Sequence, residues 1–279
     1  MPGMVRPIRV AAAGDIHCSL ENRERLGAAF ARVDGMVDLV LLAGDLTTLG
    51  EPEQAAPLAE ICRGLDSRVV AVLGNHDWHA NRRDELVAVL VGAGVTILDP
   101  GSTTCDVGGT SVGVAGAKGF VGGFPDSQLP DFGEPILRQV YRDTTAEVEA
   151  IAAGLDAVAK CDHRIVLLHY APTTTTLEGE PRVIWAFLGT DRLAVPIGEH
   201  RPDVVLHGHA HRGTFAGEIG EVPVYNVGAG DAARLLRLRA GRRRPSAVRG
   251  AGTRDSCLSL KRVRLETTAL VAQVERASA

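Results

Sequence analysis

Long apolar runs, a secretion signal and paired cysteines are all missing from this sequence. No run reaches the roughly 18 apolar residues that a membrane helix needs. The opening residues, MPGMVRPIRVAAAGD, hold no charged segment followed by an apolar segment and a cleavage site. The cysteines are odd in number, scattered, and nowhere spaced as CxxC, which argues against a disulfide framework. We therefore expect a cytoplasmic protein without a membrane partner.

Acidic residues are scarce at one end of the chain. From Arg237 onward there are 11 Lys and Arg against 3 Asp and Glu, whereas the preceding residues hold 19 basic and 31 acidic side chains. A basic tail can bind nucleic acid, but this one has no interleaved aromatic residues, and the acidic body would oppose a long nucleic-acid track. We expect a domain over residues 1–239 and a basic tail, ordered at most in part, over residues 240–279. Nucleic acid is the less favoured partner.

What the sequence does have is a series of short aliphatic runs that end in polar residues. Their continuous apolar character fits strands buried on both faces, and helical segments such as EPEQAAPLAEICRGL and NRRDELVAVLVGAG lie between them. Strand and helix in alternation indicate an α/β fold with largely parallel pairing. The later runs are closer together, which adds antiparallel pairing and favours a two-sheet core flanked by helices. The runs are IRVAAAGDIH, DLVLLAGDLT, RVVAVLGNHD, VTILDP, TSVGVAGAK, HRIVLLHYAP, DVVLHGHAH and VPVYNVGAG.

Two long stretches, residues 116–133 and 171–192, interrupt this pattern. Loops of this length in a compact domain are often lids or binding loops. In the first stretch, Lys118, Phe120 and Phe124 could close over a phosphate ester and stack on a ring, or they could belong to an ordinary packed loop.

Polar side chains gather at the ends of five of the predicted strands. In an open α/β sheet, functional groups collect at the carboxyl ends of the strands, so we expect these residues to face one crevice. Their oxygen and nitrogen donors, without a thiolate, suit manganese, iron or zinc. The residues are Asp15, His17, Asp45, Asn75, His76, His169, His207 and His209.

The number of donors exceeds what one metal ion needs. A structural zinc takes about four ligands, whereas two ions that share one bridging carboxylate would account for the larger set. Two divalent cations would outweigh the charges of Asp15 and Asp45 and leave a positive site for an anion, such as a phosphate ester. Two neighbouring ions are suited to activating water and clamping the attacking and leaving oxygens of an in-line displacement.

The ordered set DIH, GDL, GNHD, H and HGHAH resembles the calcineurin-like metallophosphoesterase superfamily over about residues 10–230. The resemblance implies a two-sheet sandwich flanked by helices, with four layers in the order αββα. It also implies two groups of metal ligands joined by Asp45, which bridges both ions. The first ion is then bound by Asp15, His17 and His209, and the second by Asn75, His169 and His207.

The same resemblance assigns His76 to the transition state, as the group that stabilises it or protonates the leaving oxygen. Asp77 then orients His76 by accepting its other N–H, although Asp77 could instead cap the helix that follows. His79, His163 and His211 match no motif position, nor does His200, and we interpret all four as surface or supporting histidines.

The resemblance predicts hydrolysis of phosphate esters by a metal-bound hydroxide. We expect a phosphodiesterase or broad-specificity phosphatase acting on small organic phosphates or nucleotides. A protein Ser/Thr phosphatase is less favoured. The stretch GDLTTLG differs from the GDxVDRG motif of those enzymes and lacks the arginine that binds the phosphate. The alternatives are a nuclease, or a protein-binding scaffold with this fold and an impaired site. Against the scaffold, every expected ligand and His76 are present.

Overall fold

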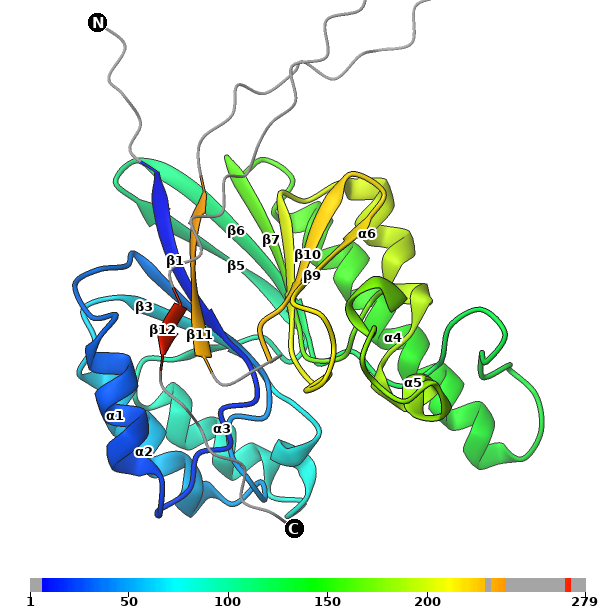
Figure 1. The fold of residues 1–279 in the computed structure, drawn as a ribbon, viewed down its shortest axis with the longest axis horizontal. Helices are drawn as coiled ribbons and strands as arrows, with labels where there is room; N and C mark the ends of the chain where they lie inside the picture. The colour runs from blue at the N-terminus through cyan, green and yellow to red at the C-terminus, as the bar shows by residue number, and fades with distance from the viewer. Residues whose placement is uncertain (1–6, 229–231, 239–268, 272–279) are drawn as a thin grey trace, which may run out of the picture.

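The computed structural model describes residues 7–228, 232–238 and 269–271, and it contains two β-sheets with helices on their outer sides (Figure 1). Each sheet has six strands, whose spatial order differs from their order in the sequence. The first sheet runs β12 (Ala269–Val271), β11 (Ala232–Leu238), β1 (Ile8–Ala13), β2 (Leu39–Ala43), β3 (Arg68–Val72) and β4 (Thr96–Ile97). The second runs β5 (Gly101–Val107), β6 (Thr110–Ala117), β7 (His163–Leu168), β8 (Val204–His207), β10 (Val222–Asn226) and β9 (Ala216–Ile219).

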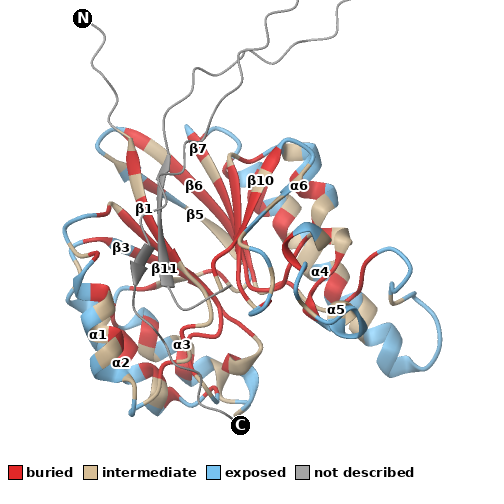
Figure 2. Cartoon of the chain, in the orientation of Figure 1, coloured by how far each residue is buried: buried red, intermediate tan, exposed pale blue. Residues whose placement is uncertain are grey.

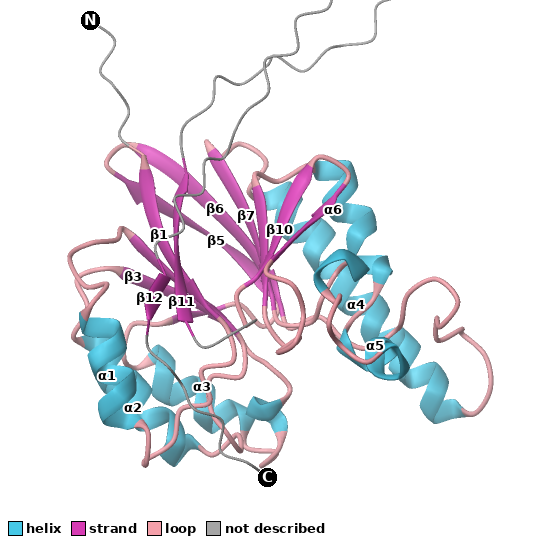
Figure 3. Ribbon diagram, in the orientation of Figure 1, coloured by secondary structure: helices cyan, strands magenta, loops and turns pink. Residues whose placement is uncertain are grey.

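The centre of each sheet is parallel and its edges include antiparallel strands. Strands β1 to β4 pair in parallel, as do β6, β7, β8 and β10, whereas β11, β12, β5 and β9 pair antiparallel. Ala13 pairs with Leu42 and Ala43 with Val72, so that the carboxyl ends of β1, β2 and β3 lie in line. The loops that follow these strands therefore meet at one edge, the lower one in Figure 3.

Alternate residues of the strands supply three apolar layers. Leu42 of β2 faces the helices α1 (Arg23–Ala31), α2 (Pro52–Arg63) and α3 (Arg83–Val91), whereas Leu41 faces the second sheet. In the second sheet, Val166 faces α4 (Pro135–Ala157) and α6 (Ala194–His200), whereas Leu167 faces the first sheet. Figure 2 shows the central strands buried along most of their length.

This arrangement confirms the predicted α/β fold with two sheets flanked by helices. The continuous aliphatic runs reflect burial on both faces of the strands. Within the described ranges, no helix has the length and apolar character needed to cross a bilayer. In the predicted tail, residues 269–271 form β12 next to β11; the other residues of the range 240–279 lie outside the part of the chain that the structure describes.

The two long stretches lie beside each other. Single β-bridges join Gly123 to Thr190 and Ala171 to Gly189. The second stretch also contains three short 3₁₀ turns (Thr174–Thr176, Arg182–Ile184 and Asp191–Leu193) and the short helix α5 (Trp185–Leu188). Both stretches are therefore folded onto the body of the protein at the end of the second sheet.

Candidate metal centre

Loops from both sheets bring carboxylate, carboxamide and imidazole groups together. Asp15, Asp45 and Asn75 follow β1, β2 and β3 of the first sheet, whereas His169 and His209 follow β7 and β8 of the second. The histidines and carboxylates form three overlapping groups, in each of which the possible ligand atoms lie within 4.8 Å of one another. The groups are Asp15, His17 and His211; His17, Asp45 and His76; and Asp45, His169 and His209.

The backbone at this centre is strained. Asp15, His17, Asp45 and His209 all have positive φ, at 54°, 46°, 48° and 70°. Residues other than glycine rarely adopt this left-handed backbone conformation, which costs about 1–3 kcal/mol for each residue. Residues in this conformation cluster at functional sites. Four neighbouring residues in this conformation indicate that the fold holds these side chains in place for a purpose other than stability.

Glycines allow the close approach of these loops. A Cβ atom on Gly74 would lie 2.1 Å from Oδ1 of Asp45. Gly44 has a φ of 83°, and a Cβ atom there would lie 2.5 Å from Nδ1 of His169. Any side chain at either position would displace a group of the centre.

His169 offers the clearest sign of a metal site. Its Nδ1 lies 2.9 Å from the carbonyl oxygen of Ala43, which can only accept, so Nδ1 carries the hydrogen. The unprotonated Nε2 then lies 2.9 Å from Oδ1 of Asn75 and 3.3 Å from Oδ1 of Asp45. In the neutral form of the ring these three atoms are all acceptors, and a cation among them would bind their lone pairs. This donor set fits a divalent ion.

His209 completes that group from the loop after β8. Its Nε2 lies 3.2 Å from the carbonyl oxygen of Phe187, which assigns the hydrogen to Nε2 and leaves Nδ1 as the lone-pair nitrogen. Burial lowers the pKa of His209 to about 3. The imidazole is therefore neutral, which is the form that binds a metal.

A second group lies around Asp15. His211 Nε2 lies 2.9 Å from Asp15 Oδ1, and the backbone N–H of His209 donates to the same carboxylate. Burial alone would raise the pKa of Asp15, but the hydrogen bond with His211 and the nearby imidazoles hold it well below its usual range. His17 Nε2 lies 3.8 Å from Oδ2 of Asp45, which links this group to the first. The donors again fit a divalent ion.

His76 lies at the solvent side of the centre. Its Nδ1 donates to the carbonyl oxygen of Thr48 across 2.7 Å, and its Nε2 lies 3.8 Å from Oδ2 of Asp45. The side chain is one-third exposed, at 33%. The second nitrogen of His76 therefore lies in the group of possible ligand atoms that His17 and Asp45 also supply.

The structure does not bring His207 into the centre. It is the last residue of β8 and is completely buried, with Nδ1 donating to the carbonyl oxygen of Gly208 and Nε2 accepting from the hydroxyl of Thr176, both at 2.8 Å. Both ring nitrogens are thus in use within the core. This geometry corrects the prediction that His207 binds a metal. His209 lies where His207 was expected, beside His169, and His211 lies where His209 was expected, beside Asp15 and His17.

Asp77 does not orient His76. Its buried carboxylate accepts hydrogen bonds from the backbone N–H groups of Leu46, Thr47 and Gly74 and from the Thr47 hydroxyl, at 2.8–3.0 Å. The carbonyl of Thr48 orients His76 instead. Burial raises the pKa of Asp77, while the backbone donors oppose this rise. Asp77 thus joins the loops after β2 and β3.

The residues predicted to contact substrate lie in the first long stretch. Lys118 donates to the carbonyl oxygen of Gly119, and its ammonium lies 4.2 Å from the centre of the Phe120 ring. Phe120 in turn meets Tyr170 edge-on. Phe124 is 2% exposed and belongs to an apolar cluster, so its ring has no face free for a substrate. The interpretation as an ordinary packed loop therefore describes Phe124.

A local sequence pattern indicates that His211, rather than His207, belongs to the loop after β8 that faces the centre. The string HGHAH contains two H-x-H pairs, and only the second comes directly after a glycine that follows a strand. The other loops share this order: Asp15 follows Gly14, Asp45 follows Gly44 and Asn75 follows Gly74. The backbone carbonyls of Ala43, Thr48 and Phe187 had no signal, because any residue supplies the same atom.

Comparisons with known proteins agree with this fold and identify the family. The sequence model of the calcineurin-like phosphoesterase family matches residues 8–213. A stretch of 75 residues is 44% identical to the symmetrical bis(5′-nucleosyl)-tetraphosphatase of Burkholderia thailandensis. That match covers 26% of this chain and 23% of the relative, so the chain matches less than a quarter of that protein's length.

Solved structures share the fold at low sequence identity. The phosphopantetheinyl hydrolase of Mycobacterium tuberculosis has a TM-score of 0.60 at 15% identity, over 79% of this chain and 89% of that one. A Thermus thermophilus protein has a TM-score of 0.55 at 19% identity, over 84% of this chain and 94% of that one. A putative 5′-nucleotidase of Staphylococcus aureus has a TM-score of 0.54 at 17% identity, over 83% of this chain and 50% of that one.

Proposed function

Because this chain belongs to the calcineurin-like phosphoesterase family, we propose that it is a phosphoric ester hydrolase that uses two divalent metal ions to hydrolyse small organic phosphate esters, nucleotides among them. The observation that carries the proposal is the convergence of lone pairs from His169, Asn75 and Asp45. A divalent cation among these acceptors would bind their lone pairs and offset the charge of Asp45.

The two ions would share Asp45. Its two carboxylate oxygens face different groups, with Oδ1 near His169 and Oδ2 near His17. The ligands proposed for the first ion are Asp15, His17, Asp45 and His211. Those proposed for the second are Asp45, Asn75, His169 and His209. Oxygen and imidazole donors without a thiolate suit manganese, iron or zinc.

When bound, two such ions polarise the phosphoryl oxygens and activate a water for in-line attack. The chain's own contribution to the reaction is His76. With Nδ1–H held by the Thr48 carbonyl, Nε2 is the atom that can donate a proton to the leaving oxygen of the ester or hydrogen-bond the phosphate. The neutral carboxamide of Asn75 adds an oxygen donor without adding negative charge, which keeps the centre attractive to an anionic substrate.

The substrate class follows from the kind of site and from the relatives. Two ions opposite two carboxylates leave a positive site that favours a phosphate group. The tetraphosphatase and the nucleotidase act on nucleotides by their names, which supports nucleotides among the substrates of this chain. We propose a phosphodiesterase or a broad-specificity phosphatase rather than an enzyme of large polymers.

The test is a turnover screen with p-nitrophenyl phosphate, its bis ester, and 2′,3′- and 3′,5′-cyclic nucleotides in the presence of Mn²⁺, Fe²⁺ or Zn²⁺. The variant Asp45→Asn should lose both ions by elemental analysis and lower kcat by about 10³-fold or more. Asp84→Asn, at an 88% exposed side chain, is the matched control and should keep both ions and full turnover. Full activity in Asp45→Asn would end the bridging assignment.

A further inference from the structure

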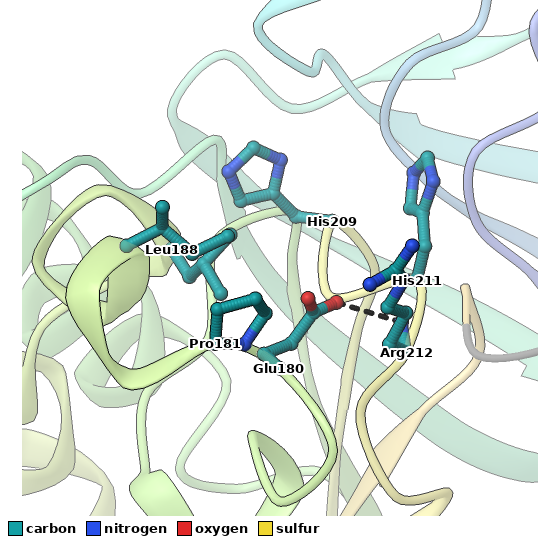
Figure 4. Close-up of a pocket in the computed structure, with 7 residues that line it drawn as sticks. Glu180, Pro181, Leu188, His209, His211 and Arg212 are labelled. Atoms are coloured by element: carbon teal, nitrogen blue, oxygen red, sulfur yellow. Dashed lines mark hydrogen bonds between the residues drawn. The ribbon is translucent and has the colours of Figure 1, made fainter.

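A cavity of about 300 Å³ opens directly beside the metal centre (Figure 4). Its inner side is formed by His209 and His211, which belong to the two candidate ion groups. Leu188 and Pro181 lie on one side of the cavity, and Glu180 and Arg212 lie towards the other, as Figure 4 shows. The cavity therefore has one apolar wall and one charged wall and borders the site of the reaction.

The apolar wall is held firmly against the body. Ile184 joins Pro181 and Leu188 in lining the cavity, and the helix α5 beside it is anchored by Trp185. The indole of Trp185 donates to the carbonyl oxygen of Glu180 across 3.1 Å and packs on a buried cluster that includes Leu188. Ile184 is 37% exposed, so its side chain is available to a ligand. A wall placed this way needs no rearrangement to bind an apolar surface.

The same segment is tied to the metal centre. The carbonyl oxygen of Phe187, in α5, lies 3.2 Å from Nε2 of His209. The helix that carries Leu188 of the apolar wall is thus in direct contact with a candidate metal-binding imidazole. A group seated on the wall would be positioned relative to a phosphate at the metal centre.

The charged wall offers donors and acceptors that remain available. The backbone N–H of Arg212 donates to Oε1 of Glu180 across 2.6 Å, which joins the two residues. Among residues 7–228, the Arg212 guanidinium and Oε2 of Glu180 make no hydrogen bond of their own. A guanidinium presents up to five N–H donors and a carboxylate presents only acceptors. This wall can therefore form hydrogen bonds with a ligand that has both acceptor and donor atoms.

We propose that this cavity binds the nucleoside group of the substrate while its phosphate lies at the metal centre. The inference rests on the proposed function and names the part of the chain that selects the substrate. A nucleobase has flat apolar faces, which suit Ile184, Pro181 and Leu188, and acceptor atoms on its edge, which suit Arg212. The sugar hydroxyls are donors for Glu180. The volume lies at the lower end of the roughly 300–1,000 Å³ of ligand pockets, which fits one nucleoside rather than a polymer.

The first experiment measures binding. Calorimetry with the metal-loaded protein compares adenosine 5′-monophosphate with inorganic phosphate. The nucleotide should bind at least about tenfold more tightly, since the burial of even one apolar group is worth about 10–200-fold. Ile184→Ser should reduce this advantage to about threefold or less. Val183→Ser is the matched control, because Val183 is the neighbouring residue, is 84% exposed and does not line the cavity; it should keep the full advantage.

The second experiment measures turnover with two diesters that share a leaving group, thymidine 5′-phosphate p-nitrophenyl ester and methyl p-nitrophenyl phosphate. The ratio of their kcat/KM values should favour the nucleoside ester by about tenfold, and Ile184→Ser and Arg212→Gln should lower that ratio. Equal binding of nucleotide and phosphate by the unaltered protein, or equal effects of Ile184→Ser and Val183→Ser, would overturn the nucleoside site. Absence of turnover with every phosphate ester would instead count against the proposed function, and the calorimetry would still decide on the cavity.

Discussion

At the scale of single residues, backbone carbonyls decide how the histidines of the centre are used. The carbonyls of Ala43, Thr48 and Phe187 each accept from one nitrogen of His169, His76 and His209. In each ring the other nitrogen is left with a lone pair or a transferable proton. This kind of support sets the tautomer of a metal-binding imidazole and raises its basicity.

A pair of histidine variants separates the two assignments of the HGHAH segment. His211→Ala should leave a folded protein that retains about one ion in place of two, because His211 contacts Asp15. His207→Gln should retain both ions but lower the free energy of unfolding by about 1–3 kcal/mol, because the buried Thr176 hydroxyl loses its partner. Elemental analysis and urea unfolding measure the two effects.

The two variants serve as controls for each other. Loss of an ion in His207→Gln, together with full metal content in His211→Ala, would restore His207 as the ligand and contradict the placement of His211 beside Asp15.

At the scale of elements, the central connection lies between the loops after β2 and β3. Asp77 accepts from Leu46 and Thr47 in one loop and from Gly74 in the other. These loops carry Asp45 and Asn75, so the separation of the two side chains depends on a buried carboxylate that contacts neither. The backbone N–H of His76 also donates to Asp45 Oδ1, across 2.9 Å, which strengthens the same connection.

The substitution Asp77→Asn should therefore act on stability. One acceptor oxygen would become an NH₂ group facing backbone N–H donors, and hydrogen bonds to a buried charge are worth about 1.5–3 kcal/mol each. We expect the free energy of unfolding of the metal-free protein to fall by about 3 kcal/mol, measured by urea denaturation. Asp84→Asn at the surface should change it by less than about 1 kcal/mol.

One outcome would contradict the role of Asp77 in joining the two loops. If Asp77 acted by orienting His76, then Asp77→Asn would lower kcat and leave the unfolding curve in place.

At the scale of the whole molecule, the centre joins the two sheets. Asp15, Asp45 and Asn75 come from loops of the first sheet, and His169 and His209 come from loops of the second. Apolar contacts such as those of Leu41 and Leu167 join the sheets farther along the strands. Metal ions at the edge would therefore add a second connection between the sheets, and their binding would favour the folded state.

Removal of metal should accordingly lower the melting temperature. At an ion concentration about 100 times the dissociation constant, binding adds about 2.7 kcal/mol, and each kcal/mol corresponds to about 2–4 °C in a protein of this size. For two ions the binding energies sum to about 5 kcal/mol, so we expect excess EDTA to lower the Tm by about 10–20 °C, measured by differential scanning calorimetry. Asp45→Asn should show no such response to EDTA, and an equal shift in that variant would mean that the chelator acts elsewhere.

Much of this molecule could be predicted from local pattern. The aliphatic runs are strands because both of their faces are buried, and helices α1 to α4 form where apolar residues recur at helical spacing. The polar residues that follow the aliphatic runs predicted Asp15, Asp45 and Asn75 as neighbours. HGHAH holds two H-x-H pairs, of which the resemblance selected the first; the structure places His209 and His211, and not His207, in the groups of possible ligand atoms.

The sequence by itself determined the layers of the fold and the kinds of donor at the centre, because burial and residue type are local properties that recur with the period of each element. The tertiary structure alone decided which atoms meet. It showed that His207 is in the core and His211 at Asp15, that Asp77 joins two loops rather than serving His76, and that Phe124 is packed away from substrate. These contacts depend on chain segments far apart in sequence and on backbone carbonyls that every residue possesses, so no local pattern could reveal them.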